Sequence, residues 1–105
     1  QPVVYEDFGF RDAQPWPEPY TTPVKEPLPA EMFRVAGCGF GAVMLTVDLL
    51  RRVHGKFGLP FSPAVGFGED LSFCLRAKEV GAEIWCDPGV ELGHIGVAYY
   101  RLEGK

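Results

Sequence analysis

Several features that would reveal a function class directly are missing from this sequence. No run of 18 apolar residues occurs, so the sequence predicts no membrane-spanning helix. The 10 Lys and Arg residues are outnumbered by 14 Asp and Glu residues, and the formal net charge is −4. This acidic balance argues against a nucleic-acid-binding surface and against a basic patch for membrane lipids. No signal peptide is visible and the chain begins with Gln1, so we expect an excerpt or a processed fragment.

Cysteine is also scarce, and its spacing argues against a disulfide framework. The three cysteines, Cys38, Cys74 and Cys86, are an odd number and lie far apart in the sequence. This usage suits a reducing compartment and predicts a cytoplasmic location. Together with His94 they supply the residue types of a four-ligand zinc site. No C-x-x-C pair supports such a site, so we expect the cysteines to behave as small hydrophobic side chains.

Proline dominates the beginning of the chain. Residues 1–30 hold seven of the ten prolines, and proline fixes φ and removes a backbone hydrogen-bond donor. The sequence therefore predicts an irregular, proline- and aromatic-rich segment over residues 1–32, with residues 14–29 irregular or extended. Its aromatic content leaves two arrangements open, a segment packed over a domain surface and a disordered arm, although apolar residues work against disorder.

Residues 33–105 have the character of a folded unit. The chain of 105 residues is at most one domain, and 47% of its residues are hydrophobic. Strands are predicted at residues 33–36, 83–86 and 90–95, the last two joined by an Asp-Pro-Gly turn. Residues 42–45 are predicted to form either a buried strand or the entry of a helix, because a short apolar run does not decide between them.

Two helices are predicted from their start and stop signals. The first begins after the N-cap Thr46 and is closed by Gly55. The second runs from Glu69 to Val80, with Gly81 as its C-terminal cap. The predicted fold class is α/β or mixed α+β, with a small mixed sheet and two main helices.

Two adjacent carboxylates, Glu69 and Asp70, stand at the start of the second predicted helix. Backbone N–H groups at a helix start stabilise carboxylates, which gives a purely structural interpretation. In the functional interpretation, a carboxylate beside a glycine-rich loop faces a ligand cleft and accepts a proton from an attacking hydroxyl. Gly66 and Gly68 would allow the backbone to approach a substrate closely.

His94 is the second candidate. Strand alternation places it on the same face as Val90 and Leu92, as for a half-buried core histidine. Neutral imidazole is also a common ligand of divalent metals. The residues alone leave both interpretations open.

A glycine-rich stretch after the first strand offers a competing hypothesis. Gly37, Gly39 and Ala42 match the G-x-G-x-x-G/A spacing of a dinucleotide-binding turn at a helix N-terminus. Such a unit needs an acidic residue at the end of the next strand, about 20 residues further on. Residues 57–61 occupy that place and form a proline-containing loop without an acid, so a dinucleotide-binding fragment is the weaker alternative.

Taken together, these segments resemble the C-terminal, acceptor-side half of a GT-A fold glycosyltransferase of the family 2 type. The stretch FRVAGCGFGAVMLTVDLLRRV is similar to the family's small-residue segment, strand and following helix. The stretch GEDLSFCLRAKEVGAEIWCDPGVELGHIG is similar to its acceptor-site carboxylate motif, helix and closing strands. The ordered pattern E-D-x-x-x-C-x-R-x-x-x-x-G, followed by D-P and G-H, is the most specific part. The resemblance covers residues 33–96 and implies the C-terminal portion of a nucleotide-diphospho-sugar transferase fold.

The resemblance implies acceptor-side roles for three residues. Asp70 matches the carboxylate that acts as base toward the acceptor hydroxyl in inverting members, and Glu69 and Gly68 match positions that hold the acceptor. The implied reaction is direct displacement, in which the deprotonating hydroxyl attacks the anomeric carbon of a nucleotide-diphosphate sugar.

The resemblance also implies a donor side. Gly39 and Gly41 match small residues beside the donor sugar pocket. His94 matches a histidine that in some members joins donor-side aspartates in binding a divalent metal, Mn or Mg, which stabilises the departing diphosphate.

The chain departs from the family pattern in three ways. It contains no D-x-D motif and no Q-x-x-R-W motif, and the N-terminal nucleotide-binding half is absent. We therefore expect it to be inactive alone and to associate with that missing half or with itself, through exposed strand edges and apolar surface. The other hypothesis is a non-catalytic α/β binding or interaction module that docks through its N-terminal segment.

Overall fold

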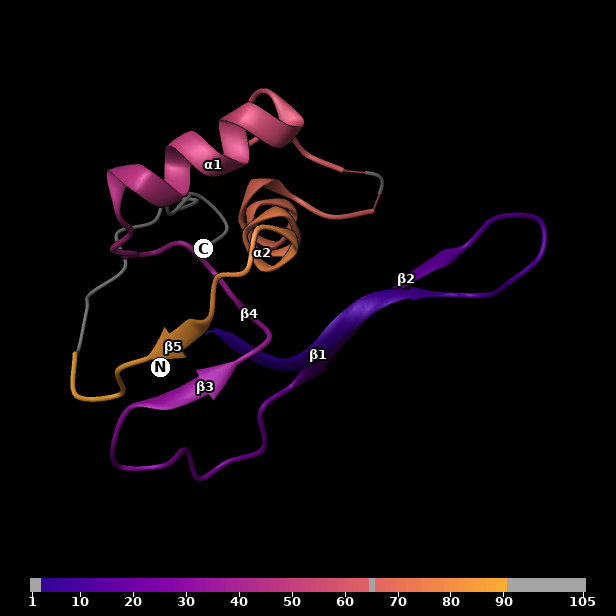
Figure 1. The fold of residues 1–105 in the computed structure, drawn as a ribbon. Coiled ribbons are helices and arrows are strands. Elements are labelled where there is room, and N and C mark those ends of the chain that lie inside the picture. The colour runs from indigo at the N-terminus through magenta and orange to yellow at the C-terminus, as the bar shows by residue number, and fades with distance from the viewer. Residues whose placement is uncertain (1–2, 65, 91–105) are drawn as a thin grey trace, which may run out of the picture.

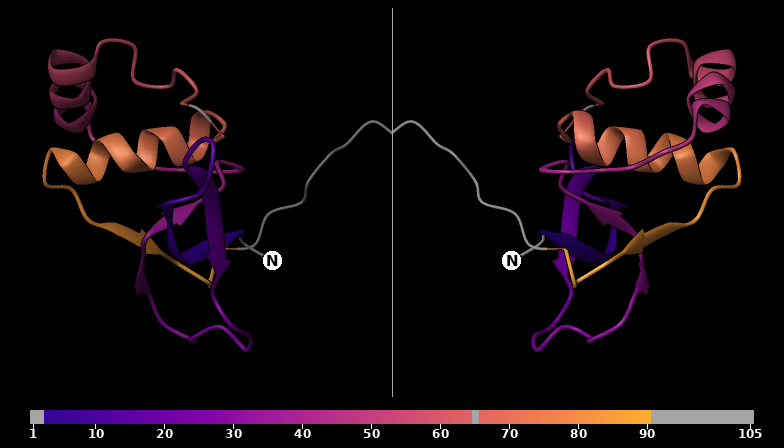
Figure 2. Two further views of the ribbon diagram at one scale, coloured as in Figure 1. Left: turned by 90° about the vertical axis from the view of Figure 1, so that its right-hand side faces the viewer. Right: turned by 90° about the vertical axis from the view of Figure 1, so that its left-hand side faces the viewer.

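The computed structural model describes residues 3–64 and 66–90. This part of the chain is a mixed α+β fold with two helices and two small antiparallel sheets (Figure 1). Both helices lie on one side of the strands (Figure 2). One sheet has the strand order β2-β1-β4 and the other pairs β3 with β5. The strands are β1 (Val4–Arg11), β2 (Glu18–Pro23), β3 (Phe33–Val35), β4 (Gly37–Cys38) and β5 (Ile84–Cys86), and the helices are α1 (Val47–Phe57) and α2 (Glu69–Glu79).

The predicted fold class is confirmed as mixed α+β. The strand pairings in the described residues are all antiparallel and are divided between two sheets, where the sequence predicted one small mixed sheet. The parallel βα units of a complete nucleotide-binding half are not part of this chain's described structure.

The expectation of an irregular segment over residues 1–32 is wrong for β1 and β2, whereas the extended backbone that was the other possibility for residues 14–29 is present in β2. β1 and β2 form an antiparallel hairpin whose register places Phe8 opposite Thr21. The physical reason is that β2 is an edge strand, where proline does not interrupt a sheet. Pro19 and Pro23 both occupy this edge strand. Figure 1 shows the turn between β1 and β2 extending beyond the helices.

Three clusters of buried side chains form the core. The first joins β1, α2 and the loop before α2, the second joins the strands, and the third lies between the two helices. Val53 of α1 is completely buried in the third cluster. Their buried members are Phe8, Phe67, Leu71 and Cys74; Val4, Val35 and Cys86; and Val53, Phe73 and Ala77.

Helix α1 begins as predicted and ends later than predicted. The Thr46 side chain accepts a hydrogen bond from the Leu49 N–H at 3.0 Å, which confirms the N-cap. Gly55 does not close the helix, which continues to Phe57. The C-cap is Gly58, whose φ of +86° is a left-handed value that glycine adopts without strain.

Helix α2 runs close to its predicted bounds. The Ala82 N–H donates to the Ala77 carbonyl and the Gly81 N–H to the Lys78 carbonyl, each at 3.0 Å. These two bonds, with a φ of +91° at Gly81, make a Schellman motif. The role of Gly81 at the helix terminus is therefore confirmed.

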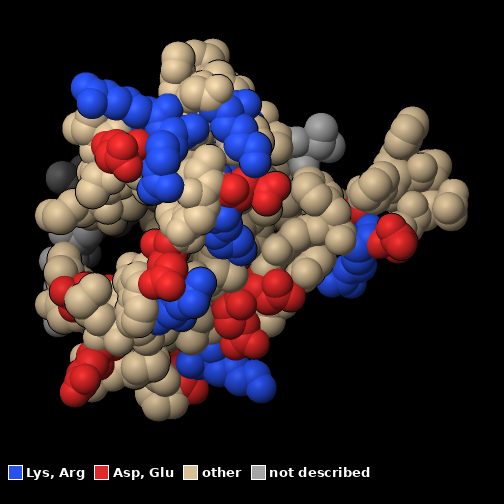
Figure 3. All heavy atoms as spheres, in the orientation of Figure 1, with Lys and Arg blue, Asp and Glu red and all other residues tan. Residues whose placement is uncertain are grey.

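The outer face of α1 is charged and is tied to the end of α2. Arg52 pairs with Asp48 one turn away at 3.2 Å and donates a hydrogen bond to the Val80 carbonyl at 2.8 Å. Basic and acidic side chains are interspersed on the face that Figure 3 presents. One arginine thus bridges the two helices at the surface.

Residues 42–45 are neither a strand nor the start of a helix. Val43 and Met44 are exposed, and Met44 is 97% accessible. A four-residue apolar run has no periodicity that indicates its partner, and of these four residues only Leu45 is partly buried. The helix begins only after the Thr46 cap.

The C-terminal part of the described chain follows the prediction in part. The strand expected at residues 83–86 forms from Ile84 to Cys86. The Asp-Pro-Gly turn is present, because the Gly89 N–H donates to the Asp87 side chain at 3.0 Å. The strand expected at residues 90–95 lies outside the described residues, except for Val90.

Candidate functional site

The structure brings Gly39 and Asp70 together from distant parts of the sequence. Gly39 directly follows β4, and Asp70 is in the first turn of α2. A Cβ atom added at Gly39 would lie 3.8 Å from Asp70 Oδ2. Gly68 is the N-cap residue of α2. We call Gly39, Gly68, Glu69 and Asp70 the Asp70 site.

The two oxygens of the Asp70 carboxylate have different surroundings. Oδ1 accepts a hydrogen bond from the Leu71 N–H at 2.7 Å, and a Cβ added at Gly68 would lie 3.5 Å from it. Oδ2 faces Gly39 instead. Asp70 is half-buried, whereas Glu69 and Gly68 are exposed. A carboxylate held by one oxygen can present the other to a ligand.

A close approach between β4 and α2 makes this arrangement possible. A Cβ atom added at Gly37 would lie 2.7 Å from Leu71 Cδ2 and 2.8 Å from Phe8 Cε1. These separations are shorter than ordinary van der Waals contacts, so only glycine fits here without repacking. Because β4 is pressed onto α2, the chain emerges from the strand beside Asp70.

The loop before the Asp70 site is fastened to α2 by two polar side chains that the sequence analysis missed. Buried Ser72 accepts a hydrogen bond from the Ala64 N–H at 2.7 Å and donates one to the Phe67 carbonyl at 3.4 Å. Arg76 donates to the carbonyls of Pro60 and Ser62 at 3.0 and 2.6 Å.

A signal for these two residues is present in the sequence. Ser72 and Arg76 are four residues apart, so they lie on one face of the helix. Both interrupt an otherwise apolar run, and buried polar groups are hydrogen-bonded as a rule. Their spacing could have predicted that α2 anchors a neighbouring loop.

The three cysteines lie in or against two of the core clusters. Cys38 packs against both the cluster that contains Cys74 and the cluster that contains Cys86. Interaction with the Cys74 thiol raises the pKa of Cys38, and interaction with the Cys38 thiol lowers the pKa of Cys74. Burial and then the nearby Asp87 raise the pKa of Cys86. The expectation that these cysteines pack as small hydrophobic residues is confirmed for the buried Cys74 and Cys86.

Gly41, one of the predicted donor-side residues, is not part of the Asp70 site. Gly41 is exposed, and a Cβ added there would meet nothing within 4 Å. His94, the predicted metal ligand, lies outside the described residues. Within the described ranges, no three His, Cys, Asp or Glu side chains are placed to hold a metal ion together.

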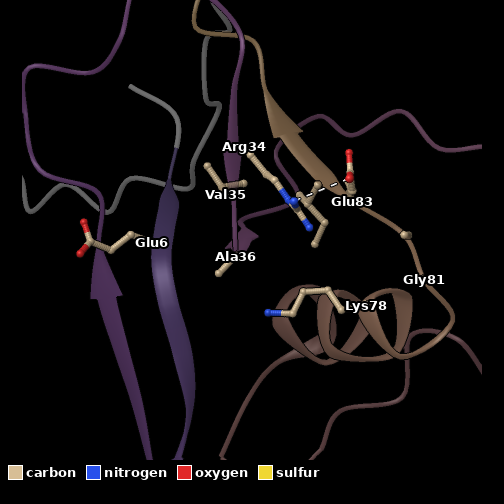
Figure 4. Close-up of a pocket in the computed structure, with 9 residues that line it drawn as sticks. Glu6, Arg34, Val35, Ala36, Lys78, Gly81 and Glu83 are labelled. Atoms are coloured by element: carbon tan, nitrogen blue, oxygen red, sulfur yellow. Dashed lines mark ion pairs between the residues drawn. The ribbon is translucent and has the colours of Figure 1, made fainter.

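A hollow of about 640 Å³ lies beside the C-terminal end of α2, the end opposite the Asp70 site (Figure 4). Arg34 and Glu83 form an ion pair of 3.6 Å among its lining residues. Lys78 extends from α2 toward the strands, and its Nζ lies 4.7 Å from the centre of the Phe8 ring. Both cations of this hollow therefore already have partners.

A smaller hollow of about 300 Å³ adjoins the Asp70 site. It lies between β2 and the start of α2, and Tyr20, Gly66 and Gly68 are among its lining residues. The Tyr20 hydroxyl donates to Asp7 at 3.0 Å, and this hydrogen bond raises the tyrosine pKa. Gly66 has a φ of +87°, and a Cβ there would lie 2.6 Å from Pro19 Cγ. The hairpin thus reaches the same end of α2 as Asp70.

The dinucleotide hypothesis requires a helix directly after the glycine turn. α1 begins only at Val47, several residues after Ala42, and β4 pairs antiparallel with β1. A dinucleotide-binding unit uses parallel strands with the helix N-terminus at the turn. The described geometry does not provide that arrangement.

Neither helix of the described chain has the length and apolar character needed to cross a membrane. Comparisons of the chain with protein-family models, characterised proteins and solved structures gave no match. The functional argument therefore depends on the Asp70 site and on the sequence motifs that it contains.

Proposed function

We propose that this chain is the acceptor-side portion of a glycosyltransferase, which moves a sugar from a nucleotide-diphosphate donor to an acceptor hydroxyl. The observation that carries the proposal is the placement of Asp70 at the start of α2 with Oδ2 facing Gly39. These are two of the residues to which the family resemblance gives roles on the acceptor and donor sides. They are far apart in the sequence, so chain order alone does not place them together.

The proposed base is Asp70. Its Oδ1 is occupied by the Leu71 N–H, which fixes the carboxylate, and Oδ2 is turned to the glycine segment. A hydroxyl that binds in front of Oδ2 would transfer its proton there as it attacks the donor sugar. Gly39 has no side chain of its own on this side of Oδ2, and Val3 Cβ is the neighbour that lies 3.3 Å from the position of a Cβ at Gly39. We expect exposed Glu69 to hold other hydroxyls of the acceptor.

A divalent metal, Mn or Mg, would neutralise the leaving diphosphate in the intact enzyme. His94 is the one metal ligand that we propose from this chain, and donor-side residues outside it would supply the rest. The free thiols suit a reducing compartment such as the cytoplasm.

The test compares Asp70→Asn with Glu69→Gln in the gene product that contains this chain. Transfer is measured against a panel of UDP- and GDP-sugars with a hydroxyl-bearing acceptor mixture, and donor binding is measured by calorimetry. We expect Asp70→Asn to lower turnover about 10²–10⁴-fold, the usual contribution of a general base, with donor affinity unchanged. We expect Glu69→Gln mainly to raise the acceptor KM. Unchanged turnover in Asp70→Asn would remove Asp70 from the reaction.

A second candidate function is a non-catalytic binding module. The projecting hairpin favours it, because Trp16 beyond β1 is 76% exposed and aromatic residues are enriched where proteins dock. This candidate predicts that Asp70→Asn leaves every measured property unchanged and that the hairpin becomes covered by a partner.

A further inference from the structure

The smaller hollow beside the Asp70 site is built by two segments that are far apart in the sequence. β2 supplies Pro19 and Thr21, and the start of α2 with the loop before it supplies Gly66 and Gly68. The loop touches the strand at one side of the hollow, because a Cβ added at Gly66 would lie 2.6 Å from Pro19 Cγ. The N-terminal hairpin therefore forms one wall of this hollow and α2 forms the other.

The register of the hairpin decides which side chains of β2 face the hollow. Thr21 is directly opposite Phe8, and directly opposed residues share one face of a sheet. Phe8 packs against Phe67 with the ring centres 5.5 Å apart, so Thr21 is on the face toward α2. The Tyr20 side chain is on the other face, where its hydroxyl donates to Asp7 at 3.0 Å. The hydroxyl that β2 offers to a ligand in the hollow is therefore that of Thr21.

The hollow has an apolar floor and a polar rim. Phe67 and Leu71, which are 8% and 7% exposed, form the floor. Thr21 and Gly68 are exposed at the rim. The described atom nearest to a Cβ added at Gly68 is Asp70 Oδ1, at 3.5 Å. Gly68 thus belongs both to the hollow and to the Asp70 site, and the hollow adjoins the Asp70 carboxylate.

The charges around the hollow favour a neutral ligand. Among the described residues, the lining contains no charged side chain. Glu69 and Asp70 directly follow Gly68, and their carboxylates repel a phosphate or carboxylate group. A hydrated cation would lose water to the apolar floor without gaining a partner there. A sugar ring is neutral, has apolar C–H groups on its faces and carries hydroxyl groups at its edge, so it fits both the floor and the rim.

We propose that this hollow binds a neutral sugar ring, with one face of the ring on Phe67 and Leu71 and one hydroxyl hydrogen-bonded to Thr21. The volume of about 300 Å³ is at the lower end of the range of small-molecule sites, which suits a single ring. That this sugar is the acceptor of the transfer reaction rests on the proposed function, because the ring would lie next to the Asp70 carboxylate. Binding of the sugar does not rest on it.

The experiment measures binding of four methyl glycosides, those of glucose, galactose, mannose and N-acetylglucosamine, to the gene product that contains this chain. Saturation-transfer NMR without a sugar-nucleotide donor is the readout. We expect signals from the ring C–H protons of at least one glycoside. Thr21→Val should weaken its binding about 2–10-fold, the usual effect of losing one hydrogen bond. Thr21→Trp should abolish binding, because the larger side chain fills the hollow.

The matched control is Thr22→Val. Thr22 is the next residue of β2 and points to the other face of the sheet, so this variant should bind the glycoside with unchanged affinity. Thr21 is exposed, and valine and tryptophan are both favourable in strands. Circular dichroism confirms that each variant is folded.

Two results would overturn the proposal. One is the absence of saturation transfer to every glycoside of the panel. The other is unchanged binding in Thr21→Trp, which would place the sugar elsewhere on the protein. Loss of transfer in Asp70→Asn without glycoside binding in the hollow would remove only this proposal. Glycoside binding together with unchanged transfer in Asp70→Asn would remove the proposed base and leave the hollow as the sugar site of a binding module.

Discussion

At the residue scale, the separation between β4 and α2 is set by the absence of a side chain at Gly37. Leu71 and Phe8 fill the space that a Cβ would take, and both belong to the first core cluster. Interiors are close-packed, so even one added methyl group must displace its neighbours. Gly37 therefore stabilises the fold and also positions Gly39 beside Asp70.

We expect Gly37→Ala to lower the free energy of unfolding by about 1–3 kcal/mol, the usual cost of an overpacked core. Urea denaturation followed by circular dichroism measures it. The matched control is Gly55→Ala, because a Cβ at Gly55 meets nothing within 4 Å and the residue lies inside α1. Alanine is the better helix former, so the control should gain roughly 0.5–1 kcal/mol. If Gly37→Ala and Gly55→Ala have equal free energies of unfolding, the core around Gly37 accommodates the added methyl group without losing stability.

At the same scale, the sequence predicted the position of Asp70 and not its surroundings. A carboxylate in a first helical turn is a local signal, because exposed N–H groups favour it. That Oδ2 faces Gly39 depends on how α2 packs against β4, and nothing in the local sequence around either residue contains that information.

At the scale of elements, α2 acts as the scaffold of the candidate site. It carries Asp70 in its first turn and fastens the preceding loop through Ser72 and Arg76. The same helix contributes buried residues to two core clusters. The position of the loop therefore follows the position of the helix.

We expect Ser72→Ala to destabilise the protein by about 1–3 kcal/mol, because the Ala64 N–H would lose the hydroxyl that accepts its hydrogen bond. Native-state hydrogen exchange should show faster exchange of the Ala64 amide proton, together with a lower global free energy of unfolding. The control is Ser62→Ala, since Ser62 offers its backbone carbonyl to Arg76 and keeps that carbonyl in the variant. Its stability should change by less than about 0.5 kcal/mol. An unchanged Ala64 amide in Ser72→Ala would mean that the loop is held by other contacts.

The helix ends at Thr46 and Gly81 were predicted correctly, whereas the end of α1 at Gly55 and the absence of N-terminal strands were wrong. The Thr46 cap and the Gly81 motif are formed by residues within one turn of each other, so short sequence windows contain them. The hairpin of β1 and β2 contains Pro19 and Pro23, which count against a strand until its edge position is known. Gly55 was a plausible helix end, but α1 continues until Gly58 supplies a positive φ.

At the scale of the whole molecule, the hairpin reaches beyond the packed helices (Figure 1). Its inner part contributes Val4 and Phe8 to the core, whereas Trp16 at its turn is largely exposed. A projecting aromatic side chain is a surface available to a partner or to another part of the same protein.

We expect Trp16 to be quenched by acrylamide more strongly than Trp85, because Trp16 is 76% and Trp85 51% exposed. The single-tryptophan variants Trp85→Phe and Trp16→Phe separate the two signals. If Trp16 in the gene product is instead the better protected of the two, the hairpin is covered. That result would favour the binding-module candidate over an acceptor-side portion with a free hairpin.

The sequence by itself determined the mixed α+β class, both helices, their caps at Thr46 and Gly81 and the turn at Asp87, because each depends on residues close together in the chain. The tertiary structure alone decided that the N-terminal segment contains a hairpin, that β4 is pressed onto α2, and that Gly39 lies beside Asp70. Those features depend on which surfaces pack together. Packing brings together residues that are tens of positions apart, such as Gly37 and Leu71. A short stretch of sequence does not contain both members of such a pair, so it does not predict the contact.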